Sequence, residues 1–185
     1  MASALKERYD KTIKDELRKR FGYDNVMRIP CVEKVVVNIG MGEAIGNAKA
    51  MDAAAGDLAT ITGQRPVVTR SKKAISNFRL RIGMPIGLKV TLRGERMWHF
   101  LEKLIHVAFP RVRDFRGIPE SAVDSTGNFH YGFTEHTVFP EIGSKEIESI
   151  HGLQISVTST AKTHDEGIKL FRALGFPFKN DEDTK

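Results

Sequence analysis

The chain has a single cysteine, Cys31, and a single tryptophan among its 185 residues. One cysteine excludes an intramolecular disulfide and gives no sign of secretion. The apolar runs are short, so the sequence offers neither a segment long enough to cross a bilayer nor the apolar region of a secretion signal. We therefore expect a cytosolic protein with no membrane partner, folded around its own apolar core.

The six histidines lack the spacing of metal ligands. His99 and His106 lie seven residues apart in a predicted helix, and His130 and His136 fall in an irregular region. Neither pair has a cysteine nearby, and no G-x-S-x-G, H-E-x-x-H or paired-carboxylate arrangement is present. The sequence thus predicts no metal site, no cofactor and no catalytic residues, so the protein is not expected to be an enzyme.

Acidic residues are nearly absent from residues 65–96, which contain nine lysines and arginines and one acid, Glu95. The net charge of the whole chain is only +6, so the net positive charge of this segment alone exceeds that of the whole chain. Clustered like charges repel one another unless a polyanion neutralises them, and a phosphate backbone is the usual polyanion. The segment therefore favours a nucleic-acid partner over the alternative, a basic surface loop with no partner.

Apolar periodicity predicts helices over residues 3–21, 47–62, 95–107 and 163–174, and strands over 32–40, 66–70, 86–92, 129–133 and 153–158. Hairpin-like neighbouring strands mixed with helices indicate an α+β fold, a mostly antiparallel sheet of about five strands with helices packed on one face. We expect a single domain over residues 1–180 and a disordered acidic tail over 181–185.

The other face of this sheet is expected to be free, with a polar surface formed by Asn38, Thr69, Lys89, Thr91 and Arg93. A second basic run covers residues 109–117, which we read as extended, so that Arg111 and Arg113 would share a side and Arg116 would follow. The alternative is that Asp114 pairs with an arginine and fixes a loop. Phe78, inside the basic segment, would either stack on a base or anchor the loop in the core.

The glycine-rich segment 40–46, GMGEAIG, follows one predicted strand and precedes a helix. It raises an alternative function, an oxidoreductase with a nucleotide cofactor, because glycines and a helix N-terminus can hold a pyrophosphate. The spacing is one residue longer than the usual fingerprint, and no second βαβ unit is predicted. The alternative is therefore weak. A general RNA chaperone is a third possibility that the basic segment permits.

Four segments in order resemble bacterial large-subunit ribosomal protein five: VVVNIGMGEA, ITGQRPVVTRSKKAISNFRLRIGMPIGLKVTLRG, PRVRDFRGI and GNFHYGFTEHTVFPEI. The resemblance runs from about residue 3 to residue 178. It implies a structural constituent of the ribosome that acts as a monomer. Its expected partners are 5S rRNA, which it attaches in the central protuberance, 23S rRNA, the peptidyl-site tRNA, and a head protein of the small subunit at an intersubunit bridge.

The resemblance also implies site residues. The positions that correspond to the neutral part of the 5S rRNA-binding surface are Asn38, Gln64 and Thr91, with Thr69 beside them. Phosphate contacts are expected from Arg65, Arg70, Lys89 and Arg93. The family's long loop corresponds to Ser71–Pro85. Its expected tRNA contacts are Lys72, Lys73, Asn77, Phe78, Arg79 and Arg81. The small-subunit bridge is expected within residues 109–145, where Arg111, Arg113 and Arg116 are further RNA or bridge candidates.

Overall fold

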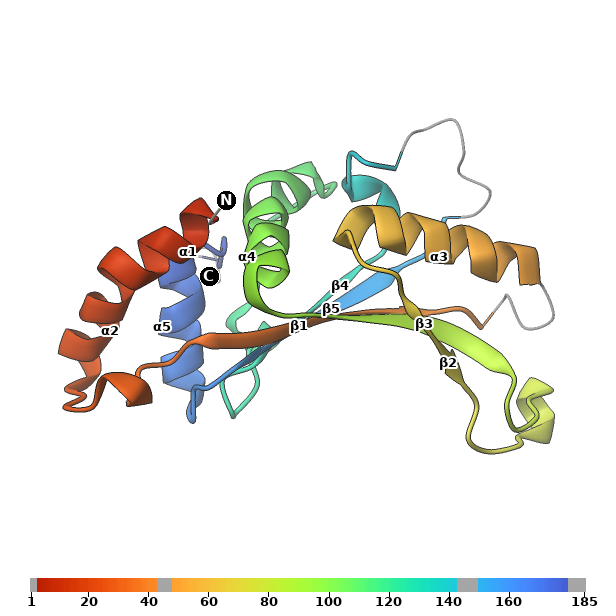
Figure 1. Cartoon of the computed structure of the whole chain (residues 1–185), viewed down its shortest axis with the longest axis horizontal. Coiled ribbons are helices and arrows are strands. Elements are labelled where there is room, and N and C mark those ends of the chain that lie inside the picture. The colour runs from red at the N-terminus through yellow and green to blue at the C-terminus, as the bar shows by residue number, and fades with distance from the viewer. Residues whose placement is uncertain (1–2, 43–47, 143–149, 180–185) are drawn as a thin grey trace. The chain divides into compact units, whose positions relative to one another are not determined.

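The structure, a computed structural model, describes residues 3–42, 48–142 and 150–179. Its strands are β1 (Val32–Gly40), β2 (Val67–Arg70), β3 (Pro85–Leu92), β4 (Phe129–Phe133) and β5 (Leu153–Ser159). They form one antiparallel sheet in the order β2-β3-β1-β5-β4 (Figure 1). Each predicted strand is present with its ends within one residue of the prediction, and the α+β class is confirmed.

The helices are α1 (Ala4–Arg8), α2 (Lys14–Phe21), α3 (Ala48–Thr62), α4 (Gly94–Lys103) and α5 (His164–Leu174). A π-helical turn over Tyr9–Ile13 joins α1 to α2, and a second one over Leu104–Ala108 extends α4. Short 3-10 turns complete the described elements, at Val26–Arg28, Ser76–Phe78, Phe109–Arg111, Glu120–Ala122 and His136–Val138. The expected tail at 181–185 and residue 47, where the second predicted helix begins, lie outside the described residues.

The first π turn has a cause in the sequence. Leu5, Tyr9, Ile13 and Leu17 recur every four residues, and all four are buried, with at most 4% of their surface exposed. An α-helix has about 3.6 residues per turn, so a strict four-residue repeat drifts around its axis. A π turn closes over one more residue than an α turn and is therefore wider, which keeps the apolar stripe on one side of the helix.

The chain divides into two compact units. The first consists of residues 1–35, 93–131 and 156–185, and an aromatic cluster forms much of its core. The ring centroid of Phe129 lies 5.4 Å from that of Phe171 and 4.9 Å from that of Phe176. All three side chains are almost fully buried, and large rings removed from water are the main source of stability in such a core.

The second unit consists of residues 36–92 and 132–155. Its helix α3 packs on one face of β3, as Figure 1 shows, and buries Leu58 and Ile61 on the same side as Leu88 and Val90. Within the described residues of this unit, α3 is the only α-helix and it lies on this face, so no α-helix covers the opposite face of the strands, which we call the open face.

No helix in the described ranges is both long enough and apolar enough to span a bilayer.

Candidate nucleic-acid interface

The open face of the second unit is built by the two-residue repeat of its strands. Along β3, the side chains of Leu88, Val90 and Leu92 are buried, whereas Lys89 is exposed and Thr91 is half-buried. Along β1, Asn38 is half-buried between the buried Val37 and Ile39. Successive side chains of a strand point to opposite faces. The structure therefore places Asn38, Lys89 and Thr91 on the face opposite to the core, as the alternation predicts.

The register of the β2–β3 hairpin adds Thr69 to this face. Val67 pairs with Lys89 and Thr69 pairs with Gly87. Residues directly opposite each other in an antiparallel pair share a face of the sheet, so Thr69 lies on the same side as Lys89. Val67 is on that side too, and 67% of its surface is exposed, which gives the face an apolar contact surface as well.

Gln64 and Thr91 are brought together by a hydrogen bond. The Gln64 side-chain amide donates from Nε2 to the backbone oxygen of Thr91 over 3.2 Å. This bond fixes the orientation of the amide, so Gln64 is held beside the end of β3. A small neutral group is thus assembled from two segments that lie 27 residues apart in the chain.

The predicted cations differ in their surroundings. Arg65, Lys89 and Arg70 are exposed in the second unit, and Arg70 donates from Nη1 to the backbone oxygen of Gly83 over 2.9 Å. Arg93 belongs to the first unit, where its Nη1 lies 3.2 Å from Glu33 Oε1. Exposed ion pairs of this kind contribute little to stability, so the Arg93 guanidinium can exchange Glu33 for a phosphate.

The basic loop Ser71–Pro85 has an internal structure of its own. Ile75 and Leu80 form an antiparallel bridge with two backbone hydrogen bonds of 3.0 Å. At its base, the Ser71 N–H donates to the Met84 oxygen over 2.8 Å and the Gly83 N–H donates to the Ser71 oxygen over 2.9 Å. A 3-10 turn over Ser76–Phe78 ends at Arg79, which adopts φ 52°. The loop is thus a small folded hairpin.

Every predicted tRNA-contact residue lies exposed on this hairpin: Lys72, Lys73, Asn77, Phe78, Arg79 and Arg81. Phe78 as a residue is 67% exposed, so it does not anchor the loop in a core of its own. An exposed ring among cations is the arrangement in which aromatic side chains stack on nucleotide bases.

The second basic run is not extended, and this prediction is wrong. Arg111 closes a 3-10 turn over Phe109–Arg111, and Asp114 adopts a left-handed conformation with φ 52° in the turn that follows. Arg111, Arg113 and Arg116 are nevertheless all exposed, in the first unit. Their charges are therefore available to a partner, although without the strand-like alternation that the sequence indicates.

The dinucleotide-binding alternative fails on topology. Residues 43–47 of the glycine-rich segment lie outside the described residues. On either side of it, β1 and β2 are separated in the sheet by β3, and β2 pairs antiparallel with β3. A dinucleotide fold instead requires parallel βαβ units with adjacent strands.

Sequence spacing missed one cluster. The structure brings Asp57, His136 and His151 together in the second unit, with one possible ligand atom from each lying within 4.8 Å of the others. These residues are distant in sequence, so only the tertiary fold reveals them.

An open sheet face with neutral polar side chains, exposed cations and a basic hairpin with an exposed aromatic ring defines an RNA-binding α+β protein. The comparisons with known proteins name the family. Residues 25–81 match the family described as Ribosomal protein L5, and residues 85–178 match the ribosomal L5P family C-terminus. The chain belongs to the ribosomal protein L5 family.

Individual relatives agree with this assignment. The chain is 55% identical over 174 residues to "Large ribosomal subunit protein uL5" of Symbiobacterium thermophilum, covering 94% of the chain and 97% of that relative. It is 52% identical over 177 residues to the protein of the same name from Dehalococcoides mccartyi, covering 96% and 98%. It is 53% identical over 175 residues to the protein of the same name from Syntrophomonas wolfei, covering 95% of the chain and 98% of that relative.

Family membership settles the general function. The protein is a structural constituent of the large ribosomal subunit, associated with rRNA, and not an enzyme. The cofactor-dependent oxidoreductase is thereby excluded.

Proposed function

We propose that the open face of the second unit binds 5S rRNA and attaches it in the central protuberance of the large subunit. The observation that carries this proposal is the hydrogen-bonded pair of Gln64 and Thr91, with Asn38 on the same open face, beside exposed cations. Short hydrogen-bonding side chains suit ribose 2′-hydroxyls and base edges, whereas cations recognise phosphates of any sequence. Such a face selects one RNA and also holds it.

The RNA element expected on this face is a loop or a bulge. An A-form duplex hides its base edges in a deep and narrow major groove, whereas unpaired bases expose them. Arg65, Arg70 and Lys89 would contact phosphates around the neutral group, and Thr69 would add a hydroxyl. Arg93, in the first unit, is proposed as a separate phosphate contact.

The experiment that tests this function is a titration against 5S rRNA, with bulk tRNA as competitor, at several salt concentrations. Asn38→Ala should weaken binding by roughly 1–3 kcal/mol, by analogy with base readout on DNA, and leave the salt dependence unchanged. Lys89→Gln should weaken binding to all RNAs alike and reduce the salt slope by about one. Lys49→Gln is the matched control, because Lys49 is exposed on α3, away from the open face.

The outcomes separate this function from a general RNA chaperone. A chaperone would bind 5S rRNA and tRNA with similar affinity, and both would dissociate as salt rises. If Asn38→Ala changed the salt slope and kept the preference for 5S rRNA, the proposed division between neutral and charged contacts would be wrong.

We further propose that the hairpin over Ser71–Pro85 contacts the peptidyl-site tRNA. Its exposed cations and the exposed Phe78 ring offer phosphate contacts and a stacking surface at one tip. The exposed Arg111, Arg113 and Arg116 are proposed to contact 23S rRNA or the head protein of the small subunit at an intersubunit bridge. In this assembly the chain would act as a monomer.

A further inference from the structure

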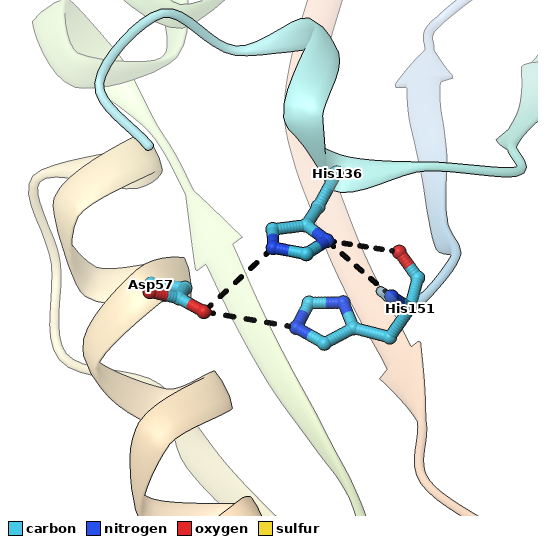
Figure 2. Close-up of side chains that lie close together, drawn as sticks. All are labelled: Asp57, His136 and His151. Carbon is cyan, nitrogen blue, oxygen red and sulfur yellow. Dashed lines mark hydrogen bonds and ion pairs between the residues drawn. The ribbon is translucent and has the colours of Figure 1, made fainter. Parts of the chain in front are cut away.

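Asp57, His136 and His151 converge from three segments of the second unit. Asp57 lies on α3, His136 begins the 3-10 turn His136–Val138 after β4, and His151 lies just before β5. Figure 2 shows the two imidazoles side by side, each with a ring nitrogen toward the Asp57 carboxylate. The ring centroids are 4.0 Å apart, and Asp57 Oδ2 lies 3.8 Å from His136 Nε2 and 3.9 Å from His151 Nε2.

Ordinary hydrogen bonding does not account for this cluster. Both distances to the carboxylate exceed the normal hydrogen-bond range. The His136 side chain is fully buried and the His151 side chain is 10% exposed. Within the described part of the chain, His136 Nε2 and both ring nitrogens of His151 have no hydrogen-bond partner. Buried polar atoms without a partner are rare in folded proteins and commonly mark a bound water or ion.

The backbone of His151 offers His136 Nδ1 both an acceptor and a donor. His136 Nδ1 lies 3.3 Å from the backbone oxygen of His151, and the backbone N–H of His151 donates to Nδ1 over 3.4 Å. Metal binding selects the other tautomer, in which Nδ1 carries the proton and donates to that oxygen in place of accepting the N–H, while Nε2 keeps its lone pair and faces Asp57. This is the usual second interaction of a histidine that binds a metal.

We propose that Asp57, His136 and His151 bind one divalent transition-metal ion of the Zn²⁺ type through two imidazole Nε2 atoms and one carboxylate oxygen. This donor set suits zinc. Tetrahedral zinc with bonds of about 2.0–2.1 Å places neighbouring ligand atoms roughly 3.3 Å apart, against 3.8 and 3.9 Å from the carboxylate oxygen to the two Nε2 atoms here. The two imidazole planes are stacked with an angle of 21° between them, so each ring must turn about its side-chain bonds to direct its Nε2 lone pair at one ion. The Asp57 side chain is 35% exposed, which gives a water access to the fourth position.

The ion would be structural. It would join α3 to the two ends of the connection between β4 and β5, since His136 follows β4 and His151 precedes β5. Such a link joins segments far apart in the chain and stabilises the folded state by an amount that rises with the logarithm of the free ion concentration once that concentration exceeds the Kd. This inference is independent of the RNA-binding proposal.

The test uses the full-length protein, stripped with a chelator, dialysed and titrated with Zn²⁺ by calorimetry and with Co²⁺ by visible absorption. One equivalent of each ion should bind, Co²⁺ should show the intense d–d bands of a four-coordinate site, and Zn²⁺ should raise the Tm. His136→Gln/His151→Gln should lose this binding, and Asp57→Asn should weaken it by at least about 10- to 100-fold, the loss seen when even outer partners of metal ligands are removed.

The matched control is His99→Gln/His106→Gln, which removes two exposed histidines and should bind Zn²⁺ as the wild type does. Circular dichroism of the metal-free variants checks that they fold, and His151→Gln alone replaces the double variant if that one does not. Failure of the wild type to take up one equivalent would overturn the proposal, as would equal losses in the control and the cluster variant.

Discussion

At the scale of single residues, Gly87 shows how closely the strands of the open face approach one another. A Cβ atom at this position would lie 2.5 Å from the backbone oxygen of Ile39 and 3.1 Å from Thr69 Oγ1. The first distance is shorter than any real Cβ contact, and a backbone oxygen cannot rotate away. The absence of a side chain at Gly87 is therefore what permits the observed pairing.

Gly87→Ala should consequently destabilise the protein by about 1–3 kcal/mol, the usual range for an overpacked site. Gly40→Ala is the matched control, because a Cβ on that strand-end glycine would meet nothing within 4 Å. Urea denaturation measures both variants. Equal midpoints for the two would show that the strands separate at little cost.

Asp124 makes a prediction about acid stability. Its Oδ1 accepts from the backbone N–H groups of Thr126 and Asn128 over 2.9 and 2.7 Å and from Thr126 Oγ1 over 2.9 Å, while Asn128 Nδ2 donates to Oδ2 over 3.0 Å. Burial alone would raise the pKa of this carboxyl, but the hydrogen bonds from Asn128 and Thr126 outweigh burial, and the pKa falls well below its usual range.

A lowered pKa stabilises the folded state above the unfolded pKa of about 3.9, and this contribution disappears as pH falls through the folded value. Asp124→Asn should thus cost about 1 kcal/mol at pH 7, a modest figure because 35% of the side chain is exposed. The difference from wild type should shrink below about pH 4. Urea midpoints across pH measure this, with Asp24→Asn as the exposed control.

At the scale of elements, two helical glycines should respond in opposite ways to the same change. In α5, a Cβ on Gly167 would lie 2.6 Å from the Gly127 Cα and 2.8 Å from the Gly127 oxygen. In α3, a Cβ on Gly56 would meet nothing within 4 Å. Gly167 thus serves the close packing of a helix on a turn, whereas Gly56 serves no packing contact.

Gly167→Ala should destabilise the protein by about 1–3 kcal/mol, because the helix must move away from the turn. Gly56→Ala should stabilise it by roughly 0.5–1 kcal/mol, because alanine restricts the unfolded chain and favours a helix. Thermal unfolding of the two variants in parallel provides the comparison. Stabilisation by both would mean that α5 is less tightly packed than these distances indicate.

The elements that the sequence predicts well are those with a local cause. The strand over Val32–Gly40 has the predicted bounds, because a run of β-branched residues disfavours a helix and fits a pleated sheet. The segment 109–117 is predicted incorrectly, because alternation over three residues does not distinguish a strand from a turn. The left-handed Asp114 and the 3-10 turn before it determine its path.

Part of the open face can likewise be predicted from local sequence. Alternation is enough to place Asn38, Lys89 and Thr91 on one side of the sheet. The bond from Gln64 to the Thr91 oxygen spans 27 residues, and the bond from Arg70 to the Gly83 oxygen spans 13. The spacing of residues in the sequence cannot predict such contacts. It is even less able to predict the grouping of His136 and His151 with Asp57, which are farther apart in the chain.

At the scale of the whole molecule, the charge is sorted into regions that should act separately. Replacing Lys72, Lys73, Arg79 and Arg81 by glutamine removes four charges from the hairpin and none from the open face. Binding to 5S rRNA should remain nearly intact, and retention of peptidyl-site tRNA on assembled ribosomes should fall, since each lost phosphate contact weakens binding. Filter retention of labelled tRNA measures the second effect.

The control for this variant removes four charges elsewhere, by glutamine replacement of Lys11, Lys14, Lys19 and Arg20 on the N-terminal helices. An equal loss of tRNA in both variants would point to net charge. Loss of 5S rRNA binding in the hairpin variant would place the loop within the 5S rRNA site.

The exposed tip of the hairpin has a consequence for the protein before it is assembled. Ile75, Phe78 and Ile82 are 42%, 67% and 73% exposed there, beside four cations. Exposed apolar side chains favour self-association, and flanking charges oppose it, as gatekeeper residues do beside aggregation-prone segments. The cations that would hold RNA thus also keep free copies apart, and added salt, which screens them, should bring those copies together.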